Sequence, residues 1–372
     1  MILITVNSGS TSVKLAAFQA ECAGATPALL ERKQYGADPS KAEAVLGEFL
    51  AGFERASIAA VAHRIVHGGS RFTHPVVIDA TTLGQLQALS PLAPLHNPVA
   101  LTWINAARSR CAPQVLQVAV FDTAFFADLP AVAAHYALPA AWSESLGVRR
   151  YGFHGLAHEA MCRRWRVLRP ELAEHGRLVT LQLGGGCSVT AIRGARPIDT
   201  SMGFSPLEGL VMATRAGDVD AAIVPYLARE LGVTAERVVE LLNHESGLLG
   251  VSASSADLRE LVGSADPRAQ LAVELYCYRA RKYLGASFAA LGGCDAIVFG
   301  GGVGEHMPEI RARILESLEW AGVALDAQAN RAAHGTEASI GAAGAAVSVH
   351  VIPVDEEDTL AAAALARLTP SA

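Results

Sequence analysis

Four short segments place histidine or arginine beside glycine or proline, the residues typical of loops. They are HRIVHGG at 63–69, PLHNP at 94–98, GFHG at 152–155 and ATRAGD at 213–218. A lone histidine in such a place is most simply a hydrogen-bonded structural residue, and a lone arginine a surface ion pair. As a set, however, the segments gather cations without matching acidic runs. That pattern predicts a site for a multiply charged anion.

Three glycine-rich turns could present backbone N–H groups to phosphate. They lie at Asn7–Ser12, which is followed by Lys14, at Gly184–Gly186 within LQLGGGCSVTAI, and at Gly300–Gly304. None matches the P-loop pattern or the GxGxxG pattern of dinucleotide-binding units. One such turn alone is most simply a tight hairpin. Three of them, each at a strand end, favour a bound nucleotide.

The elements that must position these turns occur twice along the chain. A strand, a glycine turn and a returning strand are expected at 2–18 and again at 178–192. A strand that runs into an acidic or glycine-rich loop is expected at 115–123 and again at 296–305. This long-range repetition predicts two related α/β halves.

The remaining patterns are mostly helical, and 19–59 is weakly patterned apart from one helix. We expect helices near 41–53 and over 158–168, 218–231, 234–243 with Thr234 as N-cap, 267–291, 308–320 and 356–368, and a strand over 347–352.

Composition narrows the class of protein. The 372 residues suffice for about two domains, and 51% hydrophobic with 18% charged residues is typical of a soluble enzyme. A net charge of −6 without a basic block argues against nucleic acid or an anionic membrane as partner. We find neither a membrane-spanning apolar run nor a secretory signal. Six cysteines without CxxC spacing predict a cytoplasmic protein and argue against a zinc site.

Seven segments together resemble the acetate kinase family, in order and at compatible spacing, from residue 1 to about 367. They are VNSGSTSVK, HRIVHGG, PLAPLHNP, VFDTAF, RYGFHG, SMGFSPLEGLVMATRAGDVD and VDEE. The resemblance implies a duplicated two-domain α/β fold, the actin-like ATPase (ribonuclease H-like) fold, with an interdomain active-site cleft. It implies an N-terminal domain of residues 1–123 closed by a C-terminal helix at 357–372. Residues 124–356 would form a second domain that carries most nucleotide contacts.

The resemblance also implies a catalytic set. Arg64 and Arg215 match the arginines that bind the substrate carboxylate and the transferring phosphoryl group. His154 matches a histidine that stabilises the transition state, with His96 as a supporting histidine. Asp122 matches an aspartate near the acyl substrate and the metal.

Substrate, nucleotide and metal residues follow from the same resemblance. Arg64 would bind the acyl substrate together with a small apolar pocket of Val66, Leu95, Phe153 and Pro206. The nucleotide set is Ser10, Ser12, Lys14, Gly184, Gly185, Gly186, Asp257, Leu258, Arg259, Gly302, Val303 and His306. Asn7 and Glu356 would hold Mg²⁺, with Mn²⁺ as an alternative, and ATP/ADP would be the co-substrate. The family also implies a homodimer.

The expected chemistry explains these residue types. A carboxylate acceptor, with a pKa near ~4, is already ionised at pH 7 and needs no strong base. A sugar kinase, in contrast, uses an aspartate to take a hydroxyl proton. Here the obstacle is repulsion between two anions, which arginines, a histidine and Mg²⁺ would neutralise while holding the in-line geometry. The expected reaction is reversible phosphoryl transfer from ATP to acetate, giving acetyl phosphate and ADP.

Several residues depart from the family pattern. Gly185 stands where the family has a phosphate-contacting Asn, Gln182 where it has His and Cys187 where it has Ser, so that the triple glycine resembles butyrate kinases. His306 replaces an Asn and Leu258 an aromatic residue. Diphosphate therefore stays open as donor, and propionate or another short-chain acid as acceptor. A non-catalytic nucleotide-binding regulator is the alternative of a different class, although the intact catalytic set argues against it.

Overall fold

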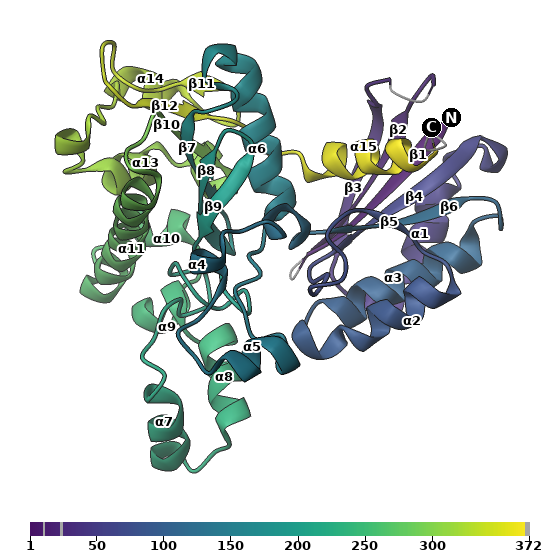
Figure 1. Ribbon diagram of the computed structural model, residues 1–372, viewed down its shortest axis with the longest axis horizontal. Coiled ribbons are helices and arrows are strands. Elements are labelled where there is room, and N and C mark those ends of the chain that lie inside the picture. The colour runs from purple at the N-terminus through teal and green to yellow at the C-terminus, as the bar shows by residue number, and fades with distance from the viewer. Residues whose placement is uncertain (10–11, 23–24, 369–372) are drawn as a thin grey trace. The chain divides into compact units, whose positions relative to one another are not determined.

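The computed structural model describes residues 1–9, 12–22 and 25–368 (Figure 1). The chain separates into two compact units. Unit 1 comprises residues 1–127, 153–156 and 355–372, and unit 2 comprises residues 128–152 and 157–354. The predicted division into domains of 1–123 plus 357–372 and of 124–356 stays a prediction.

Unit 1 is built on a six-stranded sheet with the order β3-β2-β1-β4-β6-β5. The strands β1, β4 and β6 run parallel, whereas β2, β3 and β5 are each antiparallel to their neighbours. The bounds are β1 Ile2–Ser8, β2 Ser12–Gln19, β3 Ala28–Gly36, β4 Ile58–Ile65, β5 Val76–Val77 and β6 Leu116–Phe121.

Helices cover both faces of this sheet. The helices α1 (Ala42–Leu50) and α3 (Asn97–Arg110) share one buried cluster with Ile4, whereas α15 (Glu356–Leu368) shares another with Leu3. Adjacent residues of β1 therefore point to opposite layers, as the pleat requires. A further helix, α2, spans Ala80–Ala88. The carboxyl ends of the parallel strands β1, β4 and β6 meet at one edge of the sheet, the usual place for a ligand in such folds.

Unit 2 repeats this topology. Its sheet has the order β11-β12-β10-β7-β8-β9, with β7, β10 and β12 parallel and β8, β9 and β11 antiparallel to their neighbours. The bounds are β7 Arg177–Leu183, β8 Cys187–Arg193, β9 Arg196–Thr200, β10 Ala296–Gly300, β11 Ala338–Ser339 and β12 Ser348–Val351. Each strand of unit 1 thus has a counterpart, so that the predicted pair of related α/β halves is confirmed.

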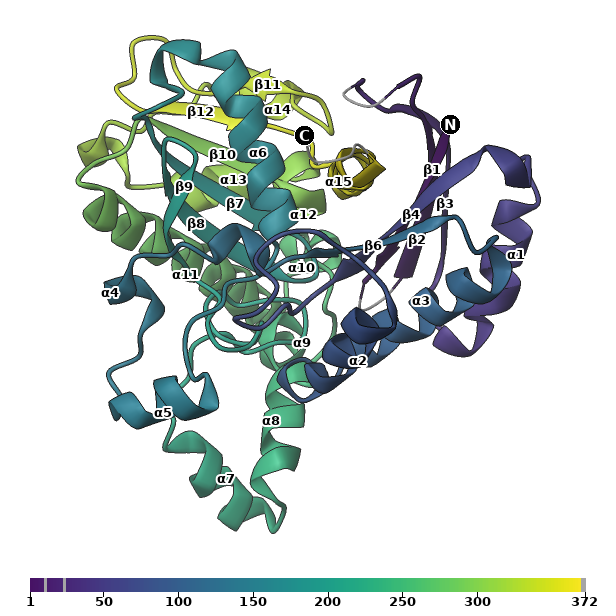
Figure 2. The same ribbon diagram turned by 45° about the vertical axis from the view of Figure 1, so that its right-hand side comes forward.

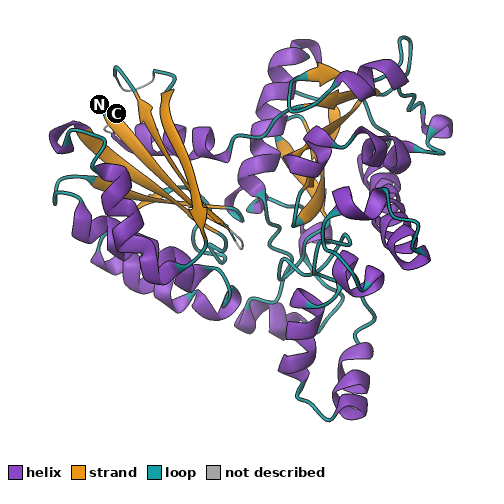
Figure 3. Cartoon of the chain, turned by 180° about the vertical axis from the view of Figure 1, so that it is seen from behind, coloured by secondary structure: helices purple, strands orange, loops and turns teal. Residues whose placement is uncertain are grey.

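Two helices sandwich the sheet of unit 2 (Figure 2). His158 on α6 bonds Ser188 of β8, whereas Tyr276 on α11 lies 3.2 Å from the neighbouring Cys187 of β8. Neighbouring strand residues face opposite sides, so α6 and α11 lie on opposite faces. The helices are α4 Ala131–Ala134, α5 Ala140–Leu146, α6 Gly155–Leu168, α7 Ile223–Leu231, α8 Ala235–His244, α9 Gly247–Ser252, α10 Leu258–Val262, α11 Pro267–Leu291, α12 Gly301–His306, α13 Pro308–Leu315 and α14 Ala327–Ala332 (Figure 3).

The helices with complete local signals match their predicted bounds. The helix α11 spans 267–291, with Asp266 as N-cap, Pro267 in its first turn and Gly292 in the left-handed conformation at its end. Thr234 caps α8 through a hydrogen bond from the Arg237 N–H, as predicted.

Other expectations were wrong. The helix expected over 218–231 begins only at Ile223, because the Asp218 carboxylate instead binds the backbone N–H of Gly209 and the hydroxyl of Tyr283. The helix expected over 308–320 ends at Leu315, and a 3₁₀ turn follows at 319–321. The edge strand β3 was not predicted. Within the described residues, no helix has the length and apolarity needed to cross a membrane.

Two histidines are buried, His63 on β4 and His67 just after it. The His63 Nε2 lies 2.8 Å from Gln117 Oε1 on β6, and burial lowers the pKa of His63 to about 4. Burial likewise lowers the pKa of His67 to about 4. In the unfolded chain a histidine takes up a proton near ~6.5. Between these values the unfolded state binds more protons, so the free energy of unfolding falls as the pH falls.

We predict that wild-type protein loses about 2 kcal/mol more unfolding free energy between pH 7 and pH 5 than a His63→Gln variant, which removes one such titrating group. Urea titration at the two pH values measures the difference. The matched control is His74→Gln, the same substitution at an exposed position. Equal pH dependence in wild type and His63→Gln would contradict the burial argument.

Candidate active site

Arg64 organises a cluster of polar side chains at the edge of the unit 1 sheet. Its Nε and Nη2 donate to the two carboxylate oxygens of Asp122 at 3.0 and 2.7 Å, a bidentate pair. Its Nη1 donates to Asn7 Oδ1 at 3.1 Å and lies 3.4 Å from Glu356 Oε2. Asn7, Arg64 and Asp122 come from the ends of the three parallel strands, and Glu356 from the start of α15. The Asp122 side chain is buried, and only 11% of the Arg64 side chain is exposed.

Asn7 ties the strand ends to two acids of α15. Its Nδ2 donates to Glu356 Oε2 at 2.8 Å and to Glu357 Oε1 at 2.7 Å. Asn7 pairs with Lys14 across the antiparallel ladder of β1 and β2, which places both side chains on one face of the sheet. The charge of Lys14 accordingly acts on both glutamates. Of the other residues expected in this turn, Ser12 begins β2, and Ser10 lies outside the described residues.

The three carboxyl groups differ in pKa. Burial alone would raise the pKa of Glu356, but the charge of Arg64 and the hydrogen bond from Asn7 outweigh it and hold that pKa below its ordinary value. Burial raises the pKa of Asp122 against the opposing charge of Arg64, and burial also raises the pKa of Glu357. Glu356 is therefore the carboxylate of this cluster that most resists protonation.

His154 lies on a tight turn against Asp122. Its φ of 58° is left-handed, which is uncommon for a residue other than glycine and is often found at functional sites. The N–H of Gly155 donates to Asp122 O at 3.1 Å, and a Cβ on Gly155 would stand 2.0 Å from that oxygen. Only glycine permits this approach. Because the N–H of Gly155 binds the Asp122 carbonyl, the backbone at His154 lies beside this cluster.

Two further predicted segments meet in unit 1. The Asn97 side-chain amide accepts the N–H of His67 at 3.2 Å and donates to its carbonyl at 3.0 Å, which joins segment 63–69 to segment 94–98. Of the predicted apolar pocket, Val66 and Phe153 are buried, and the Phe153 ring lies 5.5 Å from the His67 ring.

The remaining residues predicted in segment 94–98 are less enclosed. Leu95 is 51% exposed, and His96 is half-buried directly before α3.

The triple glycine of unit 2 has no structural reason to be glycine at two of its positions. Neither Gly184 nor Gly185 has a positive φ. A Cβ on Gly185 would meet nothing within 4 Å, and one on Gly184 would meet only Gly186 O at 3.6 Å. The absence of side chains here therefore suits something that approaches the loop from outside the protein.

Arg215 and Pro206 are connected to this glycine loop. The N–H of Ala213 donates to Gly185 O at 3.1 Å, and Arg215 Nη1 donates to Pro206 O at 3.2 Å. Within unit 2 the structure thus brings together three of the predicted site residues, Gly185, Pro206 and Arg215.

The third glycine turn packs beside the triple glycine. Gly301 has a φ of +74°, and a Cβ there would lie 2.6 Å from Leu183 O. Glu305 Oε1 accepts the N–H of Gly301 at 2.9 Å and that of Val354 at 3.0 Å. Glu305, which the sequence analysis did not single out, therefore fixes the turn that carries Gly302 and Val303.

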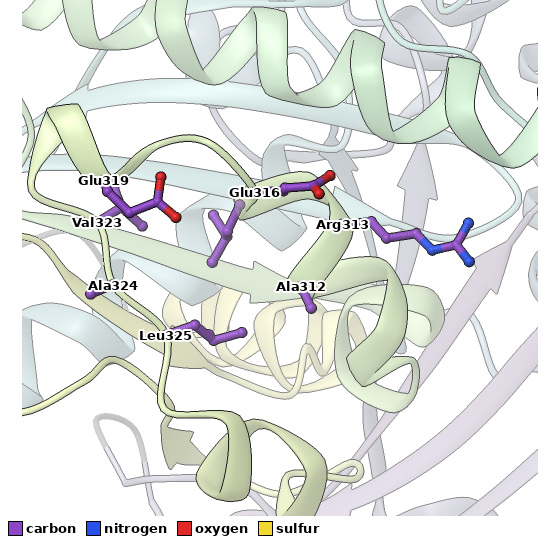
Figure 4. A pocket seen from close by; sticks show the side chains of 8 residues that line it. Ala312, Arg313, Glu316, Glu319, Val323, Ala324 and Leu325 are labelled. Carbon is purple, nitrogen blue, oxygen red and sulfur yellow. The ribbon is translucent and has the colours of Figure 1, made fainter.

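Two of the residues predicted for the adenosine line one pocket of about 500 Å³. The lining consists of Arg259, Val262, His306, Met307, Pro308, Glu309, Arg331 and His334. Of the other predicted residues, Asp257 caps α10 by accepting the N–H of Arg259, and Leu258 is buried. A second pocket, of about 360 Å³, lies beside α13 between Glu316 and Glu319 and contains no predicted site residue (Figure 4).

A buried arginine that sequence reasoning missed supports the wall of the larger pocket. Arg311 is fully buried, and burial lowers its pKa to about 10. It donates to the side chain of Asn330 and to four backbone carbonyls, which belong to Gly304, Glu305, Asn330 and Ala333. These partners come from two separated segments, so no local pattern indicates them. Glu357, which binds Asn7 beside the predicted Glu356, was not predicted either.

The residues of unit 1 fit a magnesium ion. Mg²⁺ prefers oxygen ligands and is usually bound through one or two carboxylates together with waters and substrate phosphates. The Glu356 carboxylate and Asn7 Oδ1 are such donors, and the two side chains are neighbours, since Asn7 Nδ2 donates to Glu356 Oε2. Among the described residues, no group of three or more His, Cys, Asp or Glu side chains is arranged to hold a metal.

Comparisons with known proteins give consistent findings. The model of the acetokinase family matches residues 40–362. The acetate kinase of Solibacter usitatus is 47% identical over 304 residues, which cover 81% of this chain and 73% of that protein. The crystal structure of Porphyromonas gingivalis acetate kinase has a TM-score of 0.88 at 34% identity and covers 99% of this chain and 100% of that chain. A propionate kinase from Francisella tularensis has a TM-score of 0.87 at 32% identity, with 98% of each chain covered.

The two repeated sheets and these structural matches confirm the predicted α/β, actin-like ATPase fold.

The glycine contacts generate a stability prediction. Gly185→Ala should change the free energy of unfolding by no more than ~1 kcal/mol, because its Cβ meets no protein atom. Gly155→Ala should lower it by ~2 kcal/mol or more, because its Cβ collides with a backbone oxygen. Urea unfolding measures both. A large loss in Gly185→Ala would show that the protein itself requires this glycine.

Proposed function

Because the chain belongs to the acetokinase family, we propose that it is an acetate kinase, which transfers the terminal phosphoryl group of ATP reversibly to acetate, giving acetyl phosphate and ADP. The observation that carries this proposal is the cluster around Arg64, where a charged guanidinium is fixed by Asp122 next to Asn7 and Glu356. Such a cluster suits a reaction between two anions better than one that needs a strong base.

Arg64 neutralises the approaching anions. Burial would lower the pKa of Arg64, but the carboxylates of Asp122 and Glu356 raise it, so the guanidinium keeps its charge. A guanidinium fork matches the oxygens of both a carboxylate and a phosphoryl group. Asp122 binds Arg64 with both oxygens, and the acceptor is already ionised, so Asp122 orients Arg64 and does not act as a general base.

His154 and His96 complete the contribution of unit 1. The N–H of Gly155 holds the left-handed turn at His154 beside Asp122, and this turn carries the imidazole. From there it donates a hydrogen bond to the phosphoryl oxygens as negative charge develops in the transition state. His96 supports this role, and Val66, Leu95 and Phe153 enclose the acyl methyl group.

Unit 2 supplies the nucleotide contacts and a second arginine. The backbone N–H groups of Gly184–Gly186 bind the phosphates, and Ser10, Ser12 and Lys14 stay predicted nucleotide contacts. The pocket lined by Arg259 and His306 takes the adenosine, with Gly302 and Val303 at its glycine turn. Arg215, held against Pro206, binds the transferring phosphoryl group.

Glu356 and Asn7 would hold Mg²⁺, with Mn²⁺ as an alternative. The bound ion supplies charge neutralisation on the phosphate oxygens of the nucleotide. The lowered pKa of Glu356 keeps this ligand ionised at mildly acidic pH.

Propionate is the second candidate acceptor. The solved propionate kinase resembles this chain nearly as closely as the solved acetate kinase does, with TM-scores of 0.87 and 0.88. Leu95, predicted for the acyl pocket, is about half exposed, so its side chain is less confined than those of Val66 and Phe153. A methylene changes the discrimination by only ~1–3 kcal/mol.

We also propose a cytoplasmic homodimer. All six cysteines are free thiols, which suits a reducing compartment. The helices α7 and α8, which lie at the lower end of unit 2 in Figure 1, leave Ile223, Tyr226, Leu231 and Val239 exposed. Apolar side chains gathered on neighbouring helices are typical of an interface with a second copy. Light scattering of the purified protein tests this assignment.

The proposed reaction predicts a large loss of activity when either arginine is removed. Arg64→Ala and Arg215→Ala should each lose ~3 kcal/mol or more of transition-state stabilisation, or about a 150-fold decrease in kcat/KM. A hydroxamate assay with acetate, Mg²⁺ and ATP measures the product, and Arg237→Ala at a surface ion pair serves as control. Near-wild-type kcat/KM in both variants would refute the assignment.

The donor and the acceptor can be identified in one panel. We expect wild-type protein to form acyl phosphate with ATP, and faster with acetate than with propionate or butyrate. Diphosphate in place of ATP tests the departure at Gly185. Nucleotide binding without any acyl phosphate would instead support a regulatory protein.

A further inference from the structure

Segment 200–218 carries Pro206 and Arg215, but its glutamate has no part in the proposed reaction. The Glu208 carboxylate is bound at both oxygens by side chains from a different part of unit 2. Tyr136 donates its hydroxyl to Oε2, and Arg150 donates from Nη2 to Oε1 at 2.6 Å. Because both oxygens are bound by side-chain donors, Glu208 is suited to hold structure.

Tyr136 and Arg150 extend this contact to the backbone of the segment. The Tyr136 hydroxyl accepts the N–H of Phe204 at 2.8 Å, and Arg150 Nη1 donates to the carbonyls of Thr200 and Ser201 at 3.2 and 3.4 Å. The Arg150 guanidinium also lies 5.5 Å from the centre of the Tyr136 ring. We call Tyr136, Arg150 and Glu208 the loop clamp.

Gly203 shows how closely the chain passes this clamp. A Cβ at this position would stand 1.7 Å from Glu208 Oε2 and 2.0 Å from the Tyr136 hydroxyl. Any side chain would therefore push the clamp apart. The Gly203 carbonyl accepts the N–H of Tyr151 at 2.9 Å. This hydrogen bond also joins segment 200–218 to the residue that follows Arg150.

A second carboxylate, that of Asp218, fixes the last residue of segment 200–218 through two hydrogen bonds. Asp218 Oδ1 accepts the N–H of Gly209 at 2.8 Å, and its Oδ2 accepts the Tyr283 hydroxyl at 2.7 Å. In the sequence Arg215 lies between Glu208 and Asp218. Its Nη1 donates to Pro206 O at 3.2 Å. The Pro206 carbonyl is therefore one of the partners that hold the Arg215 guanidinium, together with the sulfur of Met212 at 3.9 Å.

We propose that Glu208 is a positioning residue, which sets the place of Pro206 and, through the Pro206 carbonyl, the place of Arg215. The proposal rests on the proposed function, because it assigns Glu208 to the acyl and phosphoryl side of that reaction. The pocket with Arg259 and His306 is built from other segments. Loss of the clamp should therefore disturb the acceptor more than the nucleotide.

The test compares Glu208→Gln, Tyr136→Phe and Gly203→Ala with the wild type and with Glu230→Gln, an exposed glutamate of unit 2 that serves as matched control. The measurements are kcat, KM for acetate and propionate, KM for ATP, and Kd for ADP by calorimetry. We expect each clamp variant to raise KM for acetate at least tenfold and to change the acetate-to-propionate ratio, with Kd for ADP within twofold of wild type. The double variant Tyr136→Phe/Glu208→Gln should lose less than the two single losses multiplied together, because the two changes share the contact between Tyr136 and Glu208.

Two results would overturn the inference. Tyr136→Phe removes a single hydroxyl, so it should fold even if Gly203→Ala does not; a folded Tyr136→Phe with KM for acetate within twofold of wild type contradicts the positioning role. Equal changes in KM for acetate and in Kd for ADP would also contradict it, since they indicate a general loss of structure. Wild-type protein that forms no acyl phosphate would refute the proposed function and this inference together, whereas active wild type with unaffected variants refutes the inference alone.

Discussion

The bidentate ion pair between Arg64 and Asp122 is the interaction on which the account of this protein depends. A guanidinium that is only 11% exposed remains charged here because two carboxylates face it. Removing one partner of such a pair leaves an uncompensated buried charge, which is far more costly than losing a surface ion pair. The pair therefore fixes the position of the cation, and the cation in turn makes the meeting of two anions feasible.

The repeated sheet explains why functional groups gather at strand ends in both units. In unit 1 the ends of β1, β4 and β6 deliver Asn7, Arg64 and Asp122 to one edge. In unit 2 the corresponding ends of β7 and β10 lead into glycine turns, which offer backbone N–H groups and almost no side chains. One topology thus yields a cluster of charged side chains in one unit and a pair of glycine turns in the other. The fold itself dictates only the place, and the residues at each strand end decide the chemistry.

The sequence predicts best what local chemistry decides. The helix α11 was predicted to the residue because Asp266, Pro267 and Gly292 mark its ends without help from the rest of the chain. The edge strand β3 was not predicted, since its mostly exposed residues lack a buried face and hence an alternating pattern. The start of α7 was misplaced because Asp218 is bound by Gly209 and Tyr283, partners that no local window contains.

The candidate site likewise contains residues that the sequence predicted and residues that it did not. Motif resemblance supplied Arg64, Asp122, His154, Arg215 and Glu356, but not the geometry that relates them. Arg311 and Glu305 were not predicted, because most of their partners are backbone groups, which leave no trace in residue type, and some lie far along the chain. The triple glycine gave the clearest early signal. The structure then supplied the physical observation: the protein itself has room for a side chain at Gly185.

A double-mutant cycle between Arg64 and Asp122 tests the central claim most directly. The kcat/KM for acetyl phosphate formation would be measured for Arg64→Ala, for Asp122→Asn and for the double variant. If Asp122 acts only by holding Arg64, the double variant should be no slower than Arg64→Ala alone. Losses that multiply would show that Asp122 acts independently of Arg64, which contradicts the account.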